Sequence, residues 1–220
     1  DNHEKAIELK PDYAKAYNNL GAVLNKLNNH TTAIERFKIA LIFEPDDAST
    51  LNNIGITFGE INCHGEALKQ LKKATWINPG YVEAWYNTGR ALSSFGSSNE
   101  VAESSAFSKP EAALYSYKKA ILLDPLHTRS LVGFISVLQT FGQYIDSHKY
   151  LLLAIIIDNK EFMIQSLLLS FYQACNQIEK AMEVKNSMIA AFPTPKDINT
   201  TRPITALTVT GRAGSMFFHS

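Results

Sequence analysis

The sequence has few cysteines, no excess of either charge and no long apolar run. Cys63 and Cys175 stand far apart, without CxxC spacing or a histidine cluster nearby, so neither a disulfide framework nor a metal site is predicted. Lys plus Arg and Asp plus Glu each total 21, which gives no global electrostatic argument for nucleic acid or an anionic membrane, and neither is expected as a partner. The longest apolar run, residues 151–157, is far shorter than the about 20 residues that cross a bilayer. We therefore expect free thiols in a reducing, cytoplasmic compartment.

A fixed interval recurs along most of the 220 residues. Prolines are 34 residues apart except for one interval of 46, and an asparagine replaces one of them. This first series is Pro11, Pro45, Pro79, Pro125, Asn159 and Pro193. A second series with the same intervals is Ala6, Ala40, Ala74, Ala120, Ala154 and Met188. Because two independent series agree, the chain consists of internal repeats.

Each repeat is predicted to form two amphipathic helices, because apolar residues recur at helical spacing. In residues 14–47 these are Tyr17, Leu20, Leu24 and Leu27, followed by Ile34, Phe37, Ala40 and Leu41. Small residues recur where the helices should approach closely, at Gly21, Gly55 and Gly89, and at Ala33, Ala67, Ala113 and Ala181. Glycine costs a helix interior about 1 kcal/mol relative to alanine, so its recurrence indicates a packing need. One pair cannot bury its apolar face alone, which predicts a stacked, all-α solenoid.

The best-formed repeat resembles the tetratricopeptide (TPR) signature. It contains Tyr17-x2-Leu20-Gly21-x2-Leu24, then Ala33-x3-Phe37-x2-Ala40, then Pro45, with Leu24 in place of the usual aromatic residue. The resemblance extends from Asp1 to about Pro193. It implies a right-handed superhelix of helix-turn-helix repeats whose concave groove holds a protein or peptide.

The repeat spacing divides the chain into a half repeat and five complete repeats. The half repeat is residues 1–13, the complete repeats are 14–47, 48–81, 82–127, 128–161 and 162–195, and a linker at 196–203 follows. The repeat at 82–127 is 12 residues longer, with a Ser-rich insertion within residues 96–109. We interpret it as a tolerated surface loop rather than a binding loop or a phosphorylated tract. Ile135 and Leu169 replace the glycine and Ser147 replaces the alanine in the last two repeats, which predicts less regular packing there.

A ladder of amides is the first candidate site. Asn19, Asn53 and Asn87 occupy the sixth position of three successive repeats, which the resemblance places in the concave groove. An asparagine side chain both donates and accepts hydrogen bonds, as holding an extended peptide backbone requires. The neighbours that could add polar contacts are Asn18, Asn52, Lys15 and Arg90. The equally favoured alternative is that these asparagines form hydrogen bonds between repeats.

The C-terminal residues carry the second candidate site. Residues 204–210, ITALTVT, form a predicted strand, and Gly211-Arg212-Ala213-Gly214-Ser215 follows as a Gly-rich turn leading into a helix. Such a turn presents backbone N–H groups to an anion. It lacks the Lys-Ser/Thr pair of a Walker A loop. It resembles the 5′-phosphosulfate loop of sulfotransferases, although Ala213 and Met216 stand where polar residues are usual.

The sulfotransferase resemblance implies roles for four residues in 204–220. Arg212 would neutralise the 5′-phosphate of 3′-phosphoadenosine 5′-phosphosulfate, Ser215 would contact that phosphate, and Gly211 and Gly214 would let the backbone approach it. A complete α/β domain needs well over 100 further residues, so these 220 residues are expected to be the catalytically silent recruitment region of a sulfotransferase. Two alternatives stay open: a stand-alone TPR adaptor, and the repeat region of a TPR glycosyltransferase, which leaves the Gly-rich turn unexplained.

Overall fold

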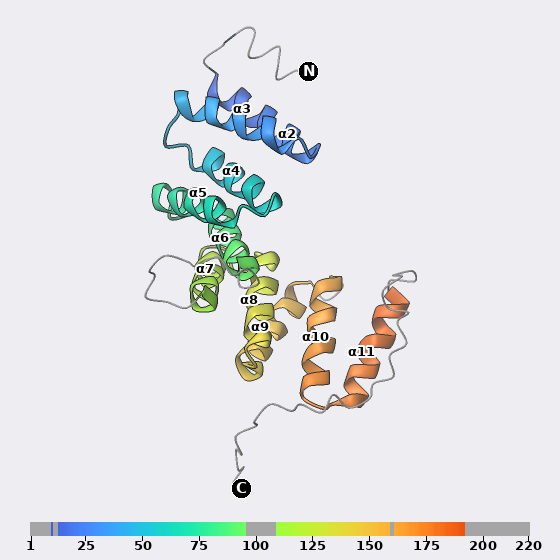
Figure 1. The fold of residues 1–220 in the computed structure, drawn as a ribbon. Helices are drawn as coiled ribbons and strands as arrows, with labels where there is room; N and C mark the ends of the chain where they lie inside the picture. The colour runs from blue at the N-terminus through green and yellow to red at the C-terminus, as the bar shows by residue number, and fades with distance from the viewer. Residues whose placement is uncertain (1–9, 11–12, 96–108, 159–160, 192–220) are drawn as a thin grey trace. The chain divides into compact units, whose positions relative to one another are not determined.

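The computed structural model of the protein describes residue 10 and residues 13–95, 109–158 and 161–191 (Figure 1). These residues form helices and no strand, which confirms the predicted all-α fold class. The first helices of successive repeats are α2 (Ala14–Lys26), α4 (Ala48–Glu60), α6 (Val82–Phe95), α8 (Thr128–Thr140) and α10 (Phe162–Ala174). The second helices are α3 (His30–Phe43), α5 (His64–Ile77), α7 (Lys109–Leu123), α9 (Tyr144–Ile157) and α11 (Ile178–Ala191). No helix in the described ranges is long and apolar enough to cross a bilayer.

The turn inside a repeat is closed by one residue in the left-handed region. These residues are Asn28 (φ 60°), Asn62 (φ 60°), Gly142 (φ 71°) and Asn176 (φ 55°). In the first complete repeat the Asn29 N–H donates to the Leu24 carbonyl at 2.9 Å, and the Asn28 N–H donates to the Asn25 carbonyl at 2.9 Å. This pair of bonds is the Schellman motif, which satisfies the last carbonyls of a helix. Asparagine and glycine tolerate the conformation best, so local sequence explains the turn.

Pro45, Pro79 and Pro125 lie just beyond the ends of second helices. Helices α3 and α5 end at Phe43 and Ile77, two residues before Pro45 and Pro79. The next helix α4 then starts from a side-chain cap, because the Asp47 carboxylate accepts from the backbone N–H groups of Ser49 and Thr50, each at 3.1 Å. Such a cap satisfies donors that have no partner within the helix.

Three recurrent glycines allow the two helices of a repeat to approach closely, which confirms the packing prediction. A Cβ atom on Gly21 would lie 2.6 Å from the ring of Phe37, and one on Gly55 would lie 2.6 Å from Leu71. A Cβ on Gly89 would lie 2.8 Å from the ring of Tyr117. Real Cβ contacts are not this short, so each glycine provides the space that the large residue of the facing helix fills.

The apolar core runs from one repeat into the next. One cluster joins Ala33 and Phe37 of α3 to Ile54 of α4. Another cluster joins Ala48 and Leu51 of α4 to Ala74 of α5 and Ala84 of α6. These helix pairs therefore bury their apolar faces against one another, as the solenoid interpretation requires.

The first helices lie closer to one another than the second helices do. Helix α2 contacts α4, α4 contacts α6, and α6 contacts α8. In the described part of the chain, no such contact joins α3 to α5, α5 to α7 or α7 to α9. The row of first helices therefore forms the inner side of this stretch, and the second helices form its outer side.

The chain divides into two compact units, Asp1–Leu167 and Leu168–Ser220. Helices α2 to α9 belong to the first unit. The described part of the second unit contains the end of α10, then a turn in which the Gln177 N–H donates to the Tyr172 carbonyl at 2.9 Å, then α11. The ammonium of Lys180 lies 5.6 Å from the centre of the Tyr172 ring. Residues 96–108 and 192–220 lie outside the described residues. They contain the predicted strand and all of the predicted insertion loop except Lys109, which begins α7.

Candidate peptide-binding groove

The predicted asparagines form hydrogen bonds that link successive first helices. Asn53 Nδ2 of α4 donates to Asn18 Oδ1 of α2 at 2.9 Å. Asn87 Nδ2 of α6 donates to Asn52 Oδ1 of α4 at 3.0 Å. The sixth residue of one repeat thus donates to the fifth residue of the repeat before it. The structure therefore shows the hydrogen bonds between repeats that the alternative interpretation predicts, and the ligand contact stays a prediction.

The exposure of these side chains decides which of them a ligand can reach. Asn52 and Asn87 are only 3% and 6% exposed, so their amides are available to each other more than to a peptide. Asn53 is half-buried, and each asparagine amide carries a second N–H as well as its oxygen. Asn19 and Lys15 are exposed. Among the predicted residues, Asn19, Asn53, Lys15 and the exposed Arg90 are the ones that a bound segment can touch.

The sixth position of the repeat at 128–161 is Gly133 instead of an asparagine, and Tyr117 explains this change. The Tyr117 ring of α7 packs between α6 and α8, where a Cβ on Gly133 would lie 2.6 Å from it. A sixth-position asparagine therefore does not fit in the repeat at 128–161. The close approach occurs at Gly133 in this repeat, two residues before Ile135, which is fully buried in place of the usual glycine. The sequence showed that Ile135 replaces the usual glycine, but it did not show that Gly133 provides the close approach instead.

Burial of its phenol raises the pKa of Tyr117 above its ordinary value of about 10. A weak hydrogen bond opposes this effect, because the hydroxyls of Ser93 and Tyr117 lie 3.5 Å apart. Nothing among the described residues around the buried phenol indicates a function in proton transfer. The phenol is buried because its ring packs against Gly89 of α6 and Gly133 of α8.

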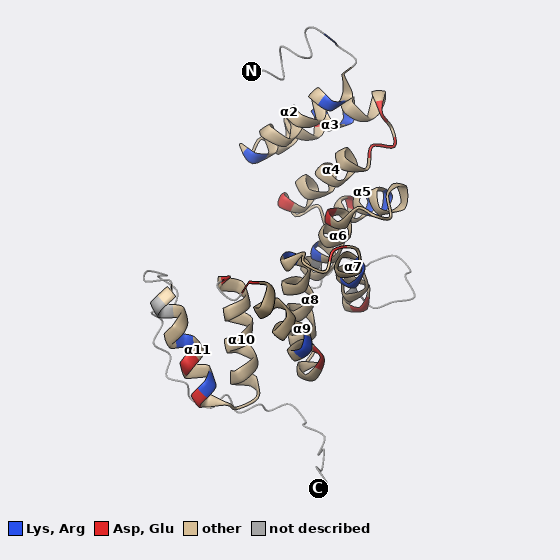
Figure 2. Cartoon of the chain, turned by 180° about the vertical axis from the view of Figure 1, so that it is seen from behind, with Lys and Arg blue, Asp and Glu red and all other residues tan. Residues whose placement is uncertain are grey.

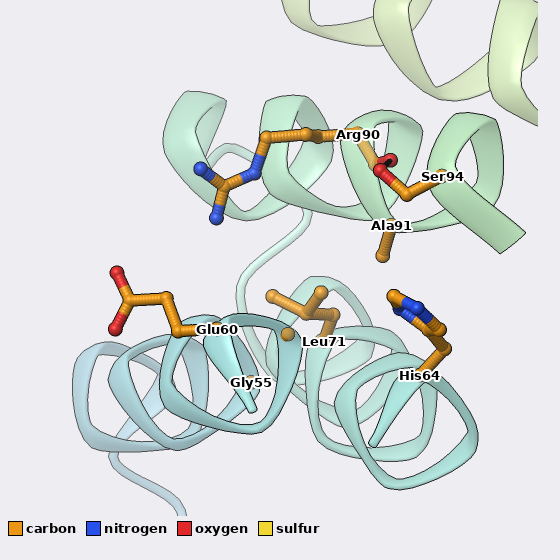
Figure 3. A pocket seen from close by; sticks show the side chains of 8 residues that line it. Gly55, Glu60, His64, Leu71, Arg90, Ala91 and Ser94 are labelled. Atoms are coloured by element: carbon orange, nitrogen blue, oxygen red, sulfur yellow. Dashed lines mark hydrogen bonds between the residues drawn. The ribbon is translucent and has the colours of Figure 1, made fainter. Parts of the chain in front are cut away.

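A pocket of about 220 Å³ opens between α4, α5 and α6 (Figure 3). Gly55, Leu71 and Ala91 form its apolar part. The space exists because α4 has Gly59 at the twelfth position, where the repeats on either side have Asn25 and Ser93. A Cβ atom on Gly59 would have no atom within 4 Å, so this glycine leaves a real opening. The absence of a side chain at one repeated position was the signal that could have predicted the pocket.

Polar groups surround the apolar part of the pocket. Glu60 and Arg90 extend from opposite walls at one end, and His64 and Ser94 lie at the other end (Figure 3). Glu60 Oε2 accepts from Asn25 Nδ2 at 2.7 Å and lies 3.7 Å from His30 Nδ1. The carboxylate of Glu60 is therefore held by the preceding repeat.

Arg90 is differently placed from Glu60. Within the described residues, no carboxylate lies within ion-pair distance of its guanidinium, which is exposed at the mouth of the pocket. A guanidinium presents several donors in a planar fork that matches a carboxylate. Of the lining residues, only Arg90 was predicted from the sequence, whereas Glu60, His64 and Ser94 were not.

The second predicted site lies outside the described residues. Gly211, Arg212, Gly214 and Ser215 all fall in residues 192–220, so their phosphate contacts stay a prediction. Cys63 and Cys175 are free thiols. No group of three metal-ligating side chains comes together within the described ranges.

The chain is similar to known tetratricopeptide-repeat sequences and structures. A family model described as tetratricopeptide repeat matches residues 4–35. The fold is similar to PilW, a type IV pilus biogenesis factor, with a TM-score of 0.77 and 21% identity over 90% of this chain and 86% of PilW. The chain has the tetratricopeptide-repeat fold. In a comparison with curated proteins, none matches the sequence of this chain.

Two further solved structures are similar to this chain. PilF from Pseudomonas aeruginosa has a TM-score of 0.74 and 19% identity over 89% of this chain and 84% of PilF. YrrB, a TPR protein with an unusual peptide-binding site, has a TM-score of 0.66 and 19% identity over 90% of this chain and 96% of YrrB. The TM-scores show that the fold is shared, and at identities this low the similarity shows the fold alone.

Proposed function

We propose that this protein is a peptide-binding scaffold and that the pocket between α4, α5 and α6 is the centre of its site. The observation that carries the proposal is the exposed guanidinium of Arg90, which has no ion-pair partner among the described residues, beside an apolar opening of about 220 Å³. An apolar side chain in the opening and a carboxylate on Arg90 would together fix the register of a bound segment. Asn53 and Asn19, farther along the same row of first helices, supply amides for its backbone. We expect the scaffold to work in the cytoplasm.

Three properties of the site support a protein or peptide ligand over a small metabolite. The pocket is partly open to solvent, and it is lined by the neighbouring first helices α4 and α6 together with α5. Its polar groups lie at its two ends (Figure 3). The TPR protein YrrB, which shares the fold, has a peptide-binding site. An open pocket on an extended face suits one anchoring side chain of a longer segment.

The experiment is selection of peptides from a random displayed library on the immobilised protein, followed by affinity measurement. We expect the selected peptides to share a large apolar residue close to an Asp or Glu. Gly59→Leu should fill the opening and weaken binding about tenfold or more, and Arg90→Ala should do the same, because a charge-assisted contact contributes about 1.5–3 kcal/mol.

Two controls make the selection decisive. Gly65→Leu also adds a side chain in open space, at the start of α5, and should leave binding unchanged. Lys26→Ala removes an exposed cation of α2 that does not line the pocket and is not one of the predicted groove residues, and it should also leave binding unchanged. Peptides that bind Gly59→Leu and Arg90→Ala as tightly as the wild type would overturn this placement of the site.

We also propose that the scaffold recruits acceptors for a sulfotransferase. Support comes from the predicted strand at 204–210 and the Gly-rich turn that contains Arg212 and Ser215. The test is calorimetry of 3′-phosphoadenosine 5′-phosphate binding by the protein as encoded by its gene, beside the Arg212→Ala variant. Equal affinity in the two proteins, or none in either, would exclude this function and leave the scaffold proposal standing.

A further inference from the structure

The outer face carries a large exposed apolar residue at one repeated position. Ile42, Trp76 and Leu122 are the 29th residues of three successive repeats, after allowance for the insertion. They are 73%, 80% and 67% exposed. The fourth repeat has the exposed Ile156 at this place. Single exposed apolar residues are ordinary on a protein surface, but recurrence in every described repeat of the first unit is not expected by chance.

An exposed lysine precedes each of the three residues by one helical turn. Lys38, Lys72 and Lys118 stand four residues before Ile42, Trp76 and Leu122. Residues at this spacing lie on the same side of a helix. Figure 2 shows the basic residues on α5 and α7. We call these six residues the outer stripe: the lysines form one row along the array, and the apolar residues form a second row.

The lysines of the outer stripe differ from their neighbours because their charges are not used inside the protein. Lys69 pairs with Glu66 at 3.9 Å, Lys73 donates to the Pro45 carbonyl at 3.3 Å, and Lys119 lies 5.5 Å from the Tyr115 ring. In contrast, the ammonium groups of the three outer-stripe lysines have no partner in the described part of the chain. Their shared feature is an unpaired positive charge beside an unburied apolar side chain.

We propose that the outer stripe docks an acidic amphipathic segment of a partner protein. Carboxylates of the partner would pair with Lys38, Lys72 and Lys118, and its apolar residues would cover Ile42, Trp76 and Leu122. Charge complementarity selects an acidic partner, and the adjoining apolar row requires large apolar residues beside its acids. Trp76 is the expected centre, because tryptophan is enriched among the residues that dominate binding energy.

An anionic bilayer fits the face less well than a protein segment does. The residue two places after Ile42 is Glu44 and the one after Leu122 is Asp124. An anionic surface that reached the apolar row would be repelled by these carboxylates, because like charges oppose close approach. A protein segment can place its acids on the lysine side alone. None of the six residues of the outer stripe lines the proposed pocket between α4, α5 and α6, so the two sites can be tested separately.

The test uses Trp76 as its own reporter. The protein has two tryptophans, so Trp85→Phe leaves Trp76 alone. The probe is a synthetic helical peptide of about 20 residues, about 30 Å long, with a leucine face flanked by glutamates. We expect saturable binding with a blue shift of the Trp76 emission. A peptide with lysine in place of each glutamate should not bind.

Two sets of variants separate the contributions of charge and apolar area. In Lys38→Glu/Lys72→Glu/Lys118→Glu, the acidic peptide should bind about tenfold or more weakly and the lysine peptide should bind instead. Ile42→Ser/Leu122→Ser keeps the Trp76 reporter and should weaken binding of the acidic peptide by a similar factor. Lys26→Glu/Arg129→Glu reverses two exposed charges on the first helices, outside the proposed pocket, and should leave binding unchanged. Circular dichroism establishes that each variant is folded.

Three results would overturn the proposal. The first is absence of peptide binding in the wild type, or equal loss in the first-helix control. The second is binding to phosphatidylcholine–phosphatidylserine vesicles that shifts Trp76 emission more than the peptide does, which would indicate a membrane surface. The third is a dimer in sedimentation that Trp76→Ser dissociates, which would indicate a second copy of this chain on the stripe.

Discussion

Asn87 donates its side-chain N–H to Asn52 Oδ1 at 3.0 Å, across two successive first helices, and both side chains are almost completely buried. Asn53 and Asn18 repeat the same contact one repeat earlier. A column of residues that resembles a ligand-binding ladder in sequence is therefore also a set of bonds that connects the repeats. Variants of these residues have to be interpreted for stability before they are interpreted for binding.

Asn52→Ala should lower the free energy of unfolding by about 1–3 kcal/mol, because the buried Asn87 amide loses its acceptor. Asn19→Ala is the matched control. Asn19 is an exposed asparagine of the ladder whose side chain has no partner in the described residues, so we expect a change within about 0.5 kcal/mol. Urea unfolding of the three proteins measures both. Equal stability of the two variants would mean that the buried amide contact contributes little.

Gly133→Ala should destabilise the protein by about 1–3 kcal/mol, because its Cβ would lie 2.6 Å from the Tyr117 ring. This loss would exceed the about 1 kcal/mol that alanine gains over glycine in a helix. Gly59→Ala makes the same change where no atom lies within 4 Å and should stabilise by up to about 1 kcal/mol. Thermal melts distinguish the signs, and stabilisation by both variants would contradict the packing described for Tyr117.

Asp47→Ala should cost about 0.5–2 kcal/mol, because the backbone N–H groups of Ser49 and Thr50 lose their acceptor. The neighbouring Asp46 is exposed, and Asp46→Ala changes the same charge without removing the cap. Urea midpoints of the two variants are the comparison. A loss of similar size in both would show that charge in this turn, and not the cap, is responsible.

Stability should fall in alkaline solution. The folded-state pKa of Tyr117 is raised by burial of the phenol, and that of Tyr81 is raised by burial as well. A tyrosine with a raised folded pKa holds its proton more tightly when folded, so its contribution is complete below about pH 10 and is lost as the pH rises through the higher folded pKa.

Urea unfolding from neutral to alkaline pH tests this dependence. Tyr117→Phe, which cannot ionise, should flatten the decline above about pH 10. Tyr115→Phe removes an exposed tyrosine of the same helix α7 and should keep the decline of the wild type. The interpretation fails if the Tyr117→Phe curve runs parallel to the wild-type curve throughout this range.

The repeat interval, the helix pairs, the turns and the close approach at three glycines are all determined by the sequence. They follow from local rules: apolar residues at helical spacing, Asn or Gly where φ is positive, proline after a helix end, and glycine opposite Phe37 or Leu71. Each of these patterns involves residues of a single repeat. Because the pattern recurs along the chain, it can be recognised in the sequence without knowing how the repeats pack.

Only the tertiary structure decided how one repeat meets the next. The Asn53–Asn18 bond, the pocket that Gly59 leaves open and the packing of Tyr117 against Gly133 each join residues of different repeats. The exposure of Ile42, Trp76 and Leu122 likewise depends on which side of α3, α5 and α7 the adjacent helices cover. In the sequence, each of these residues is compatible with more than one role. Packing between repeats decides the role, because it determines which side chains contact protein and which contact water.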